Sequence, residues 1–67
     1  MVTVCINGTK REVPNGTTLE ELMNLFKLTK KSVVLELNRS VVDRNIYSAT
    51  RLKQNDTVEI VHFVGGG

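Results

Sequence analysis

The chain begins with apolar side chains at every second position, namely Val2, Val4 and Ile6. This alternation predicts a β-strand over residues 2–6 with one buried face. The pair Asn7-Gly8 follows, and it favours a two-residue hairpin because both central residues of a type I′ turn need a positive φ. We therefore expect a return strand over residues 9–13, which is more polar and suits the edge of a sheet.

The spacing of the apolar residues becomes helical after the turn at residues 14–16. Positions i, i+3, i+4 and i+7 of one predicted helix face are occupied by Leu19, Leu22, Met23 and Phe26. Thr18 and Glu21 have the spacing of a capping box, in which each side chain binds the other's free backbone N–H. We expect the apolar stripe of this helix to lie on the sheet. Three lysines fall at or after its C-terminus: Lys27, Lys30 and Lys31.

The second half of the chain predicts further strands. An apolar run predicts a strand over residues 33–37, a short strand follows at Val41-Val42, and residues 57–64 form the most apolar strand. Residues 43–54 have no clear period. We expect a long loop or a short helical turn there, with three side chains packed beneath it: Ile46, Ala49 and Leu52.

This order of elements predicts an α+β fold. A helix between a hairpin and later strands makes a right-handed crossover, and the apolar last strand belongs at the centre, beside the first strand and parallel to it. The result is a mixed sheet of four to five strands with one main helix on one face, the β-grasp or ubiquitin-like architecture. We expect a β-grasp domain over residues 1–64 and a flexible glycine tail at 65–67.

Composition narrows the class of protein. The 67 residues are enough for one small domain, and the single cysteine excludes an internal disulfide and fits a reducing compartment. No run approaches the roughly 20 apolar residues of a membrane span. The net charge of +2 is too small to indicate nucleic-acid binding by itself. We expect a cytoplasmic protein.

The chain ends in three glycines that follow the last predicted strand directly. Residues without a Cβ can enter a channel too narrow for other side chains, and they carry a terminal carboxylate. A frayed end or a remnant of cloning is the alternative interpretation of such a run.

The segment Val-His-Phe-Val-Gly-Gly-Gly at residues 61–67, together with Asn7-Gly8 and the short length, resembles the ThiS-type sulfur carriers of thiamin biosynthesis. That family has the ubiquitin-like β-grasp fold. A Gly-Gly ending alone is shared with ubiquitin, the small subunit of molybdopterin synthase and Urm-type carriers. Two terminal glycines are the minimum in the family, and this chain has three.

The resemblance implies chemistry at the α-carboxylate of Gly67. A ThiF-like enzyme would adenylate it with ATP, a persulfide donor would convert it to a thiocarboxylate, and a ThiG-like thiazole synthase would take the sulfur. Gly65 and Gly66 would thread the tail into these partner active sites. The carrier itself would have no catalytic residue, no bound cofactor and no metal, and it would not be an enzyme.

Val61 and Phe63 are the candidate partner patch. If Val58 and Ile60 face the helix, Val61 and Phe63 lie on the opposite face, where exposed apolar side chains mark a binding surface. The alternative is that they only cover neighbouring strands.

Other polar side chains give weaker signals. Cys5 has no cationic neighbour in the flanking sequence and is interpreted as a small apolar filler. His62 has no second ligand at metal-binding spacing. The basic residues are scattered, and any of three could meet an acidic partner: Arg39, Arg44 or Arg51.

Three other functions stay open. The chain could serve molybdopterin synthesis or another sulfur pathway, it could be a ubiquitin-like modifier attached to lysines, or it could be an interaction or nucleic-acid-binding module. The last lacks support because Phe26, Tyr47 and Phe63 are the only aromatic residues. An enzyme acting alone has still less support, because no acid–base or nucleophile constellation is visible.

Overall fold

The computed structural model describes residues 1–29 and 31–62 and opens with the expected hairpin. Strands β1 (Val2–Ile6) and β2 (Thr9–Val13) pair antiparallel, with Ile6 opposite Thr9. The turn between them has φ values of 48° at Asn7 and 84° at Gly8, as a type I′ turn requires. The prediction made from the Asn-Gly pair is confirmed.

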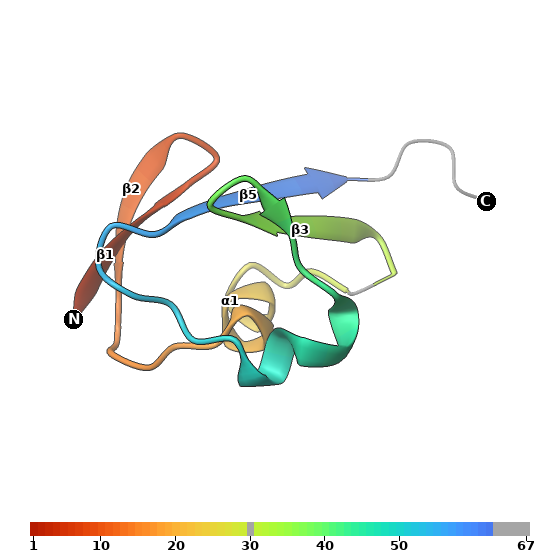
Figure 1. The fold of residues 1–67 in the computed structure, drawn as a ribbon, viewed down its shortest axis with the longest axis horizontal. Coiled ribbons are helices and arrows are strands. Elements are labelled where there is room, and N and C mark those ends of the chain that lie inside the picture. The colour runs from red at the N-terminus through yellow and green to blue at the C-terminus, as the bar shows by residue number, and fades with distance from the viewer. Residues whose placement is uncertain (30, 63–67) are drawn as a thin grey trace.

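The sheet has five strands in the order β2-β1-β5-β3-β4 (Figure 1). Strand β5 (Thr57–His62) lies at its centre, parallel to β1 and antiparallel to β3 (Val33–Leu37). The mixed sheet and the central last strand are therefore as predicted. The short β4 (Ser40–Val41) begins one residue before the expected strand. The predicted end of the domain at residues 63–64 and the tail at 65–67 lie outside the described residues.

Helix α1 (Leu19–Leu25) begins at the predicted capping box. The backbone N–H of Glu21 donates to Thr18 Oγ1 over 3.1 Å, and the Thr18 N–H donates to Glu21 Oε1 over 2.8 Å. The helix ends at Leu25, with Phe26 as its C-cap. Lys27 comes next and has a left-handed conformation with φ 57°. Three residues of the predicted stripe are buried, namely Leu19, Leu22 and Met23. The fourth, Phe26, is partly buried and packs against the core.

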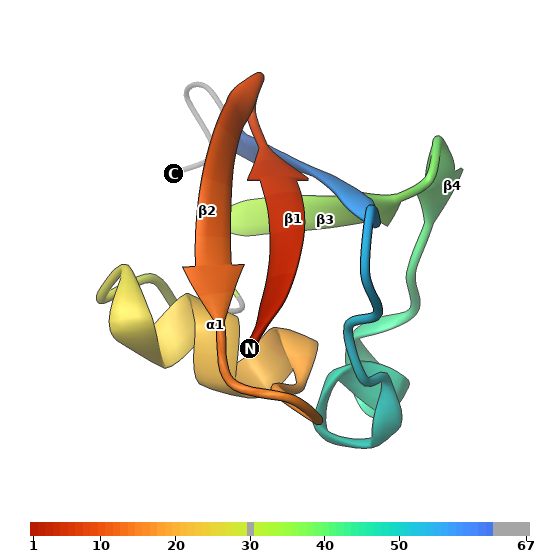
Figure 2. The ribbon, with the colours of Figure 1, turned by 90° about the vertical axis from the view of Figure 1, so that its left-hand side faces the viewer.

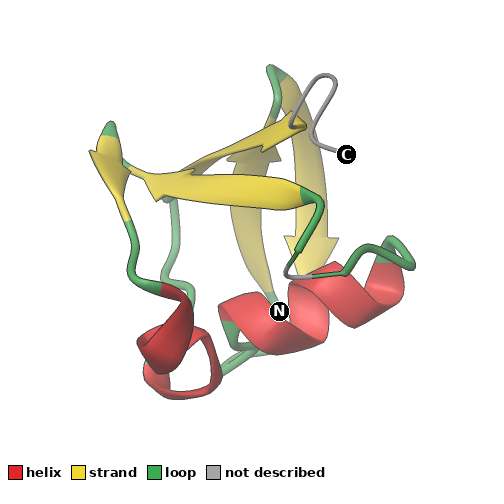
Figure 3. Ribbon diagram, turned by 90° about the vertical axis from the view of Figure 1, so that its right-hand side faces the viewer, coloured by secondary structure: helices red, strands yellow, loops and turns green. Residues whose placement is uncertain are grey.

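The fold has two layers. Figure 2 shows the β1–β2 hairpin crossing in front of β3, as a strongly twisted sheet requires. Figure 3 shows α1 and the 3₁₀-helix η1 (Arg44–Ala49) beneath one face of this sheet, and none of the described helices lies on the other face. The core fills the space between the layers and is formed by Val4, Ile6, Val13, Leu19, Leu22, Met23, Val33, Leu35, Tyr47, Leu52, Val58 and Ile60. In the described part of the chain, no helix is long and apolar enough to cross a membrane.

The segment 43–54 packs differently from the prediction. Leu52 is buried as expected, but Ile46 and Ala49 are exposed, and Tyr47 is the side chain that enters the core, with 1% of its surface exposed. A 3₁₀-helix has three residues per turn, so Ile46 and Ala49 share one face while Tyr47 lies on another. The expected short helical turn is present, but the prediction was wrong for Ile46 and Ala49, because the inward face of the 3₁₀-helix carries Tyr47 instead.

Tyr47 also completes the hydrogen bonding of β3. Its hydroxyl accepts a hydrogen bond from the Leu35 N–H over 3.2 Å, and the Leu35 carbonyl accepts one from the Val42 N–H over 3.0 Å. Strand β4 pairs only with Glu36 and Leu37, so it does not reach Leu35. A side chain from η1 therefore supplies what a longer edge strand would have supplied.

Replacing Tyr47 with Phe should test this contact, because it removes the hydroxyl and keeps the buried ring. The Leu35 N–H would lose its acceptor, and we expect the free energy of unfolding in urea to fall by about 1–3 kcal/mol. Ile46→Ala in the same helix is the control and should cost less than about 1 kcal/mol, because Ile46 is 49% exposed. Equal losses in the two variants would contradict the role given to the hydroxyl.

Candidate functional site

Most of the candidate site lies in the last five residues, 63–67, which the structure does not describe. Gly65, Gly66 and Gly67, together with Phe63 of the candidate patch, lie outside the described residues. What the structure describes is the strand that leads to them, since β5 ends at His62. The geometry of the site is therefore the geometry of β5 and its surroundings.

Strand β5 is supported unequally along its two edges. On the β3 edge, five register pairs run from Leu37 opposite Val58 to Val33 opposite His62. On the β1 edge there are two register pairs, Cys5 with Thr57 and Ile6 with Val58. The last residues of β5 are therefore held mainly by β3.

The two faces of β5 differ as the alternation of its side chains requires. Val58 and Ile60 point toward α1 and are 0% and 8% exposed, whereas Val61 on the opposite face is 47% exposed. The predicted parity of β5 is confirmed as far as His62. Val61 is thus fixed to a rigid strand while presenting its side chain to solvent.

A mixed apolar and acidic surface surrounds Val61 on the face of the sheet without helices. Val61 lies opposite Val34, Glu59 lies opposite Glu36, and Glu36 also lies opposite Val41, which is 68% exposed. We call this surface the sheet-face patch; its residues are Val34, Glu36, Val41, Glu59 and Val61. Only Val61 of this patch was predicted from the sequence, and the facing glutamates depend on the register of β3 against β5. Like charges in directly opposite positions destabilise a sheet.

The match to known proteins decides the family. A profile described as the ThiS family matches residues 4–67. The chain belongs to the ThiS family. The β-grasp assignment agrees, because the crystal structure of ThiS, a thiamine biosynthesis protein from Geobacter metallireducens, superposes with a TM-score of 0.84 at 32% identity, covering 98% of this chain and 100% of that one.

Two relatives show how such a chain is used elsewhere. The sulfur carrier protein ThiS of Bacillus subtilis is 38% identical over 50 residues, which are 75% of this chain and 76% of that protein. A thiazole synthase of Magnetococcus marinus is 40% identical over 62 residues, or 92% of this chain. This ThiS family chain spans only 19% of the length of that synthase.

Cys5 lies on the same face as the sheet-face patch and is half-buried. The flanking sequence offers no cation, but the register of the hairpin puts Lys10 directly opposite Cys5. That neighbour was missed because it depends on the pairing of two strands. His62, at the end of β5, lines a hollow of about 350 Å³ with Arg11 and Phe26. Within the described residues, no group of three or more His, Cys, Asp or Glu side chains could hold a metal ion.

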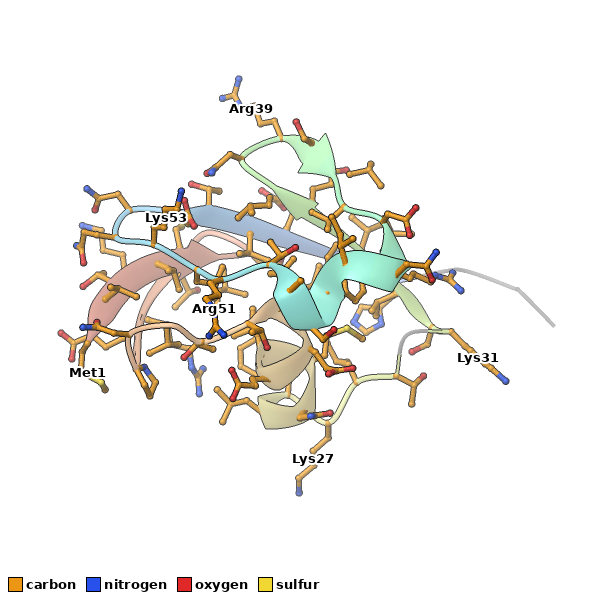
Figure 4. All side chains as sticks on the ribbon, turned by 60° about the horizontal axis from the view of Figure 1, so that its bottom comes forward. Met1, Lys27, Lys31, Arg39, Arg51 and Lys53 are labelled. Atoms are coloured by element: carbon orange, nitrogen blue, oxygen red, sulfur yellow. The ribbon has the colours of Figure 1, made fainter. Side chains whose placement is uncertain are left out.

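The basic side chains of this ThiS family chain that are labelled in Figure 4, all within the described residues, do not gather into one surface. Figure 4 shows Lys27, Lys31 and Arg39 projecting from separate parts of the molecule. The guanidinium of Arg51 donates to the Gly16 carbonyl over 2.8 Å, which gives it a structural role, and Arg44 also has a partner. All three candidate arginines are exposed, and Arg39 lies in the turn between β3 and β4. The described residues therefore give no support to a nucleic-acid-binding surface.

The facing glutamates give a testable prediction. Glu59→Gln removes one of two like charges, so we expect the free energy of unfolding to rise by about 0.2–1 kcal/mol in low salt. The gain should shrink as added salt screens the repulsion. Glu12→Gln is the matched control, since Glu12 lies opposite Thr3 rather than another acid. Equal effects of the two substitutions in urea unfolding would show that the repulsion between Glu36 and Glu59 is negligible.

Proposed function

We propose that this chain is a sulfur carrier of thiamin biosynthesis, with the sulfur held as a thiocarboxylate at Gly67. The observation that carries the proposal is the match to the ThiS family, which extends through residue 67 and so includes the whole glycine segment. The named sulfur carrier of Bacillus subtilis supports the same function. By itself the chain is a protein substrate, without a bound cofactor or a catalytic group of its own.

The chemistry follows from the weakness of a carboxylate as an electrophile. In the proposed reaction, the Gly67 carboxylate attacks the α-phosphorus of ATP in a ThiF-like adenylating enzyme and releases pyrophosphate. The terminal sulfur of a persulfide donor then attacks the carbonyl carbon, and AMP leaves. Cleavage of the resulting S–S bond by a thiol leaves the sulfur on Gly67 as a thiocarboxylate anion. That anion is a nucleophile suited to sulfur transfer.

The shape of the arm suits two different active sites. Five residues follow His62 and, when fully extended, span at most roughly 17 Å. Gly65 and Gly66 carry no Cβ, so a narrow channel in either partner could admit them. The domain would stay outside while the terminal carboxylate reaches the reacting atoms.

The partner that consumes the sulfur is a ThiG-like thiazole synthase. Two relatives support this partner. A region of a thiazole synthase of Magnetococcus marinus is 40% identical to this chain, and a region of another of Paramagnetospirillum magneticum is 32% identical. Each match covers 92% of this chain. Such a region joined to a synthase keeps the carrier close to its acceptor.

The sheet-face patch, together with Phe63, is the proposed docking surface. Val61 and Val34 supply apolar area on a face without helices, and Glu36 and Glu59 supply negative charge for a basic partner surface. Complementary charge of this kind favours fast and specific association. The described end of β5, at His62, lies directly after Val61 of this proposed docking surface.

The sulfur chemistry can be tested by the intact mass of the protein purified from its native host. We expect a fraction that is heavier by one sulfur in place of one oxygen, and its loss when Gly67 is deleted. Circular dichroism of the deletion variant should be unchanged, since the described fold ends before the glycines. No heavier species, even with ATP, the adenylating enzyme and a persulfide donor supplied, would contradict the proposal.

The docking surface can be tested with Val61→Asp. We expect its affinity for the adenylating enzyme to fall about tenfold or more, because an exposed apolar contact is replaced by a charge. The melting temperature should change little, since Val61 is 47% exposed. Ser48→Asp adds the same charge on η1, beneath the other face, and should leave the affinity unchanged. Unchanged affinity of the Val61 variant in calorimetry would contradict the assignment.

A further inference from the structure

We propose that Asn7 is a positioning residue for the carrier arm, because its side-chain amide holds the backbone of Ile60 and fixes the strand that leads to the glycines. This inference rests on the proposed function and deepens it. It concerns the base of the arm, whereas the reacting group is at the arm's end.

The need for Asn7 arises from the short pairing of β1 with β5. The last register pair is Ile6 with Val58, and the backbone N–H of Asn7 donates to the Val58 carbonyl over 3.0 Å. The chain then turns away into the hairpin. Two residues further along β5, the N–H and the carbonyl of Ile60 face the same edge, where β1 no longer continues.

The Asn7 side chain fills that place. Its Oδ1 accepts a hydrogen bond from the Ile60 N–H over 2.7 Å, and its Nδ2 donates to the Ile60 carbonyl over 3.3 Å. A carboxamide has one acceptor oxygen and an N–H donor, as a peptide unit has. Only one orientation of the amide satisfies both partners, so the side chain acts as one further residue of β1.

The consequence concerns where the firm part of the strand ends. With Asn7 in place, the β1 edge of β5 is hydrogen-bonded as far as Ile60, and Val61 and His62 continue along β3. Without the amide, the edge of β5 toward β1 would be free from Glu59 onward. The direction of the arm would then vary more, and the carboxylate would occupy its reactive position in the adenylating enzyme less often.

The turn alone would explain a left-handed residue at position 7 but not these two bonds. Asn is favoured at φ 48°, and glycine is also accepted there. The two bonds, however, reach a residue 53 positions away along the chain. Asn7→Gly therefore separates the roles, because it keeps the turn and removes the amide.

Asn38 provides a matched control at the other end of the same strand. It has φ 51°, its Oδ1 accepts from the Thr57 N–H over 2.9 Å, and its Nδ2 donates to Asp56 Oδ1 over 3.1 Å. Asn38→Gly thus removes one side-chain hydrogen bond from the first residue of β5 and one from Asp56, which directly precedes the strand. Loss of general stability should be similar in the two variants, but only the Asn7 variant loosens the base of the arm.

The test measures adenylation of the full chain by the adenylating enzyme of its own host, using ATP–pyrophosphate exchange. We expect kcat to fall about tenfold for Asn7→Gly, with KM changed less than about twofold because β3 still holds Val61 in the sheet-face patch. For Asn38→Gly, both constants should stay within about twofold of the native values. Asn7→Asp keeps the acceptor for the Ile60 N–H and loses the donor, so its kcat should be intermediate.

Amide hydrogen exchange tests the anchoring without any partner. Exchange at Ile60 should be about tenfold faster in Asn7→Gly, while Asn38→Gly should instead speed exchange at Thr57. Equal kcat in the two glycine variants, or unchanged exchange at Ile60, would overturn the inference. If the native chain is not adenylated at all, the carrier proposal fails, and exchange at Ile60 alone decides whether Asn7 anchors the strand.

Discussion

The fold depends on one requirement, which is that the backbone of the central strand β5 must find hydrogen-bond partners on both edges. A buried N–H or carbonyl without a partner costs free energy comparable to a lost hydrogen bond. The sheet of this small domain is too irregular to meet that requirement with strands alone, because β1 covers only the first part of β5. Side chains of Asn7 and Asn38 supply the missing partners near the two ends of β5. Tyr47 does the same for β3, where β4 is too short.

The local part of this arrangement could be predicted from the sequence, since each element is specified by neighbouring residues. The Asn-Gly pair predicted the hairpin, Thr18 with Glu21 predicted the start of α1, and the alternation in β5 predicted that Val61 lies on the face away from the helix. The non-local part could not be predicted in the same way. The opposition of Glu36 and Glu59, the pairing of Cys5 with Lys10 and the burial of Tyr47 follow from strand register and from a 3₁₀-helix. Patterns within one segment do not determine these.

The candidate site also has one part that could be predicted from neighbouring residues and one part that could not. The glycines are visible in the sequence because they have an unusual composition, and the family match includes them. The support for the arm is not visible, because Asn7 and Ile60 are 53 positions apart. A turn residue in the first hairpin therefore has a second role at the far end of the chain. Function at the arm and folding of the domain share the same strand, so substitutions in β5 affect both unless they are confined to its exposed face.

The parallel pairing of β1 with β5 also has a mechanical consequence. In a parallel pair, the start of one strand and the end of the other lie at opposite ends. A partner that pulls the arm outward while the β1 side of the domain is held applies force along the strands. The hydrogen bonds from Cys5 to Asp56 and from Asn7 to Val58 are then loaded together in shear, and so are the two side-chain bonds from Asn7 to Ile60. Under such a force these bonds do not open one at a time, as they would in an unzipping hairpin, so we expect this pairing to resist a pull along the arm.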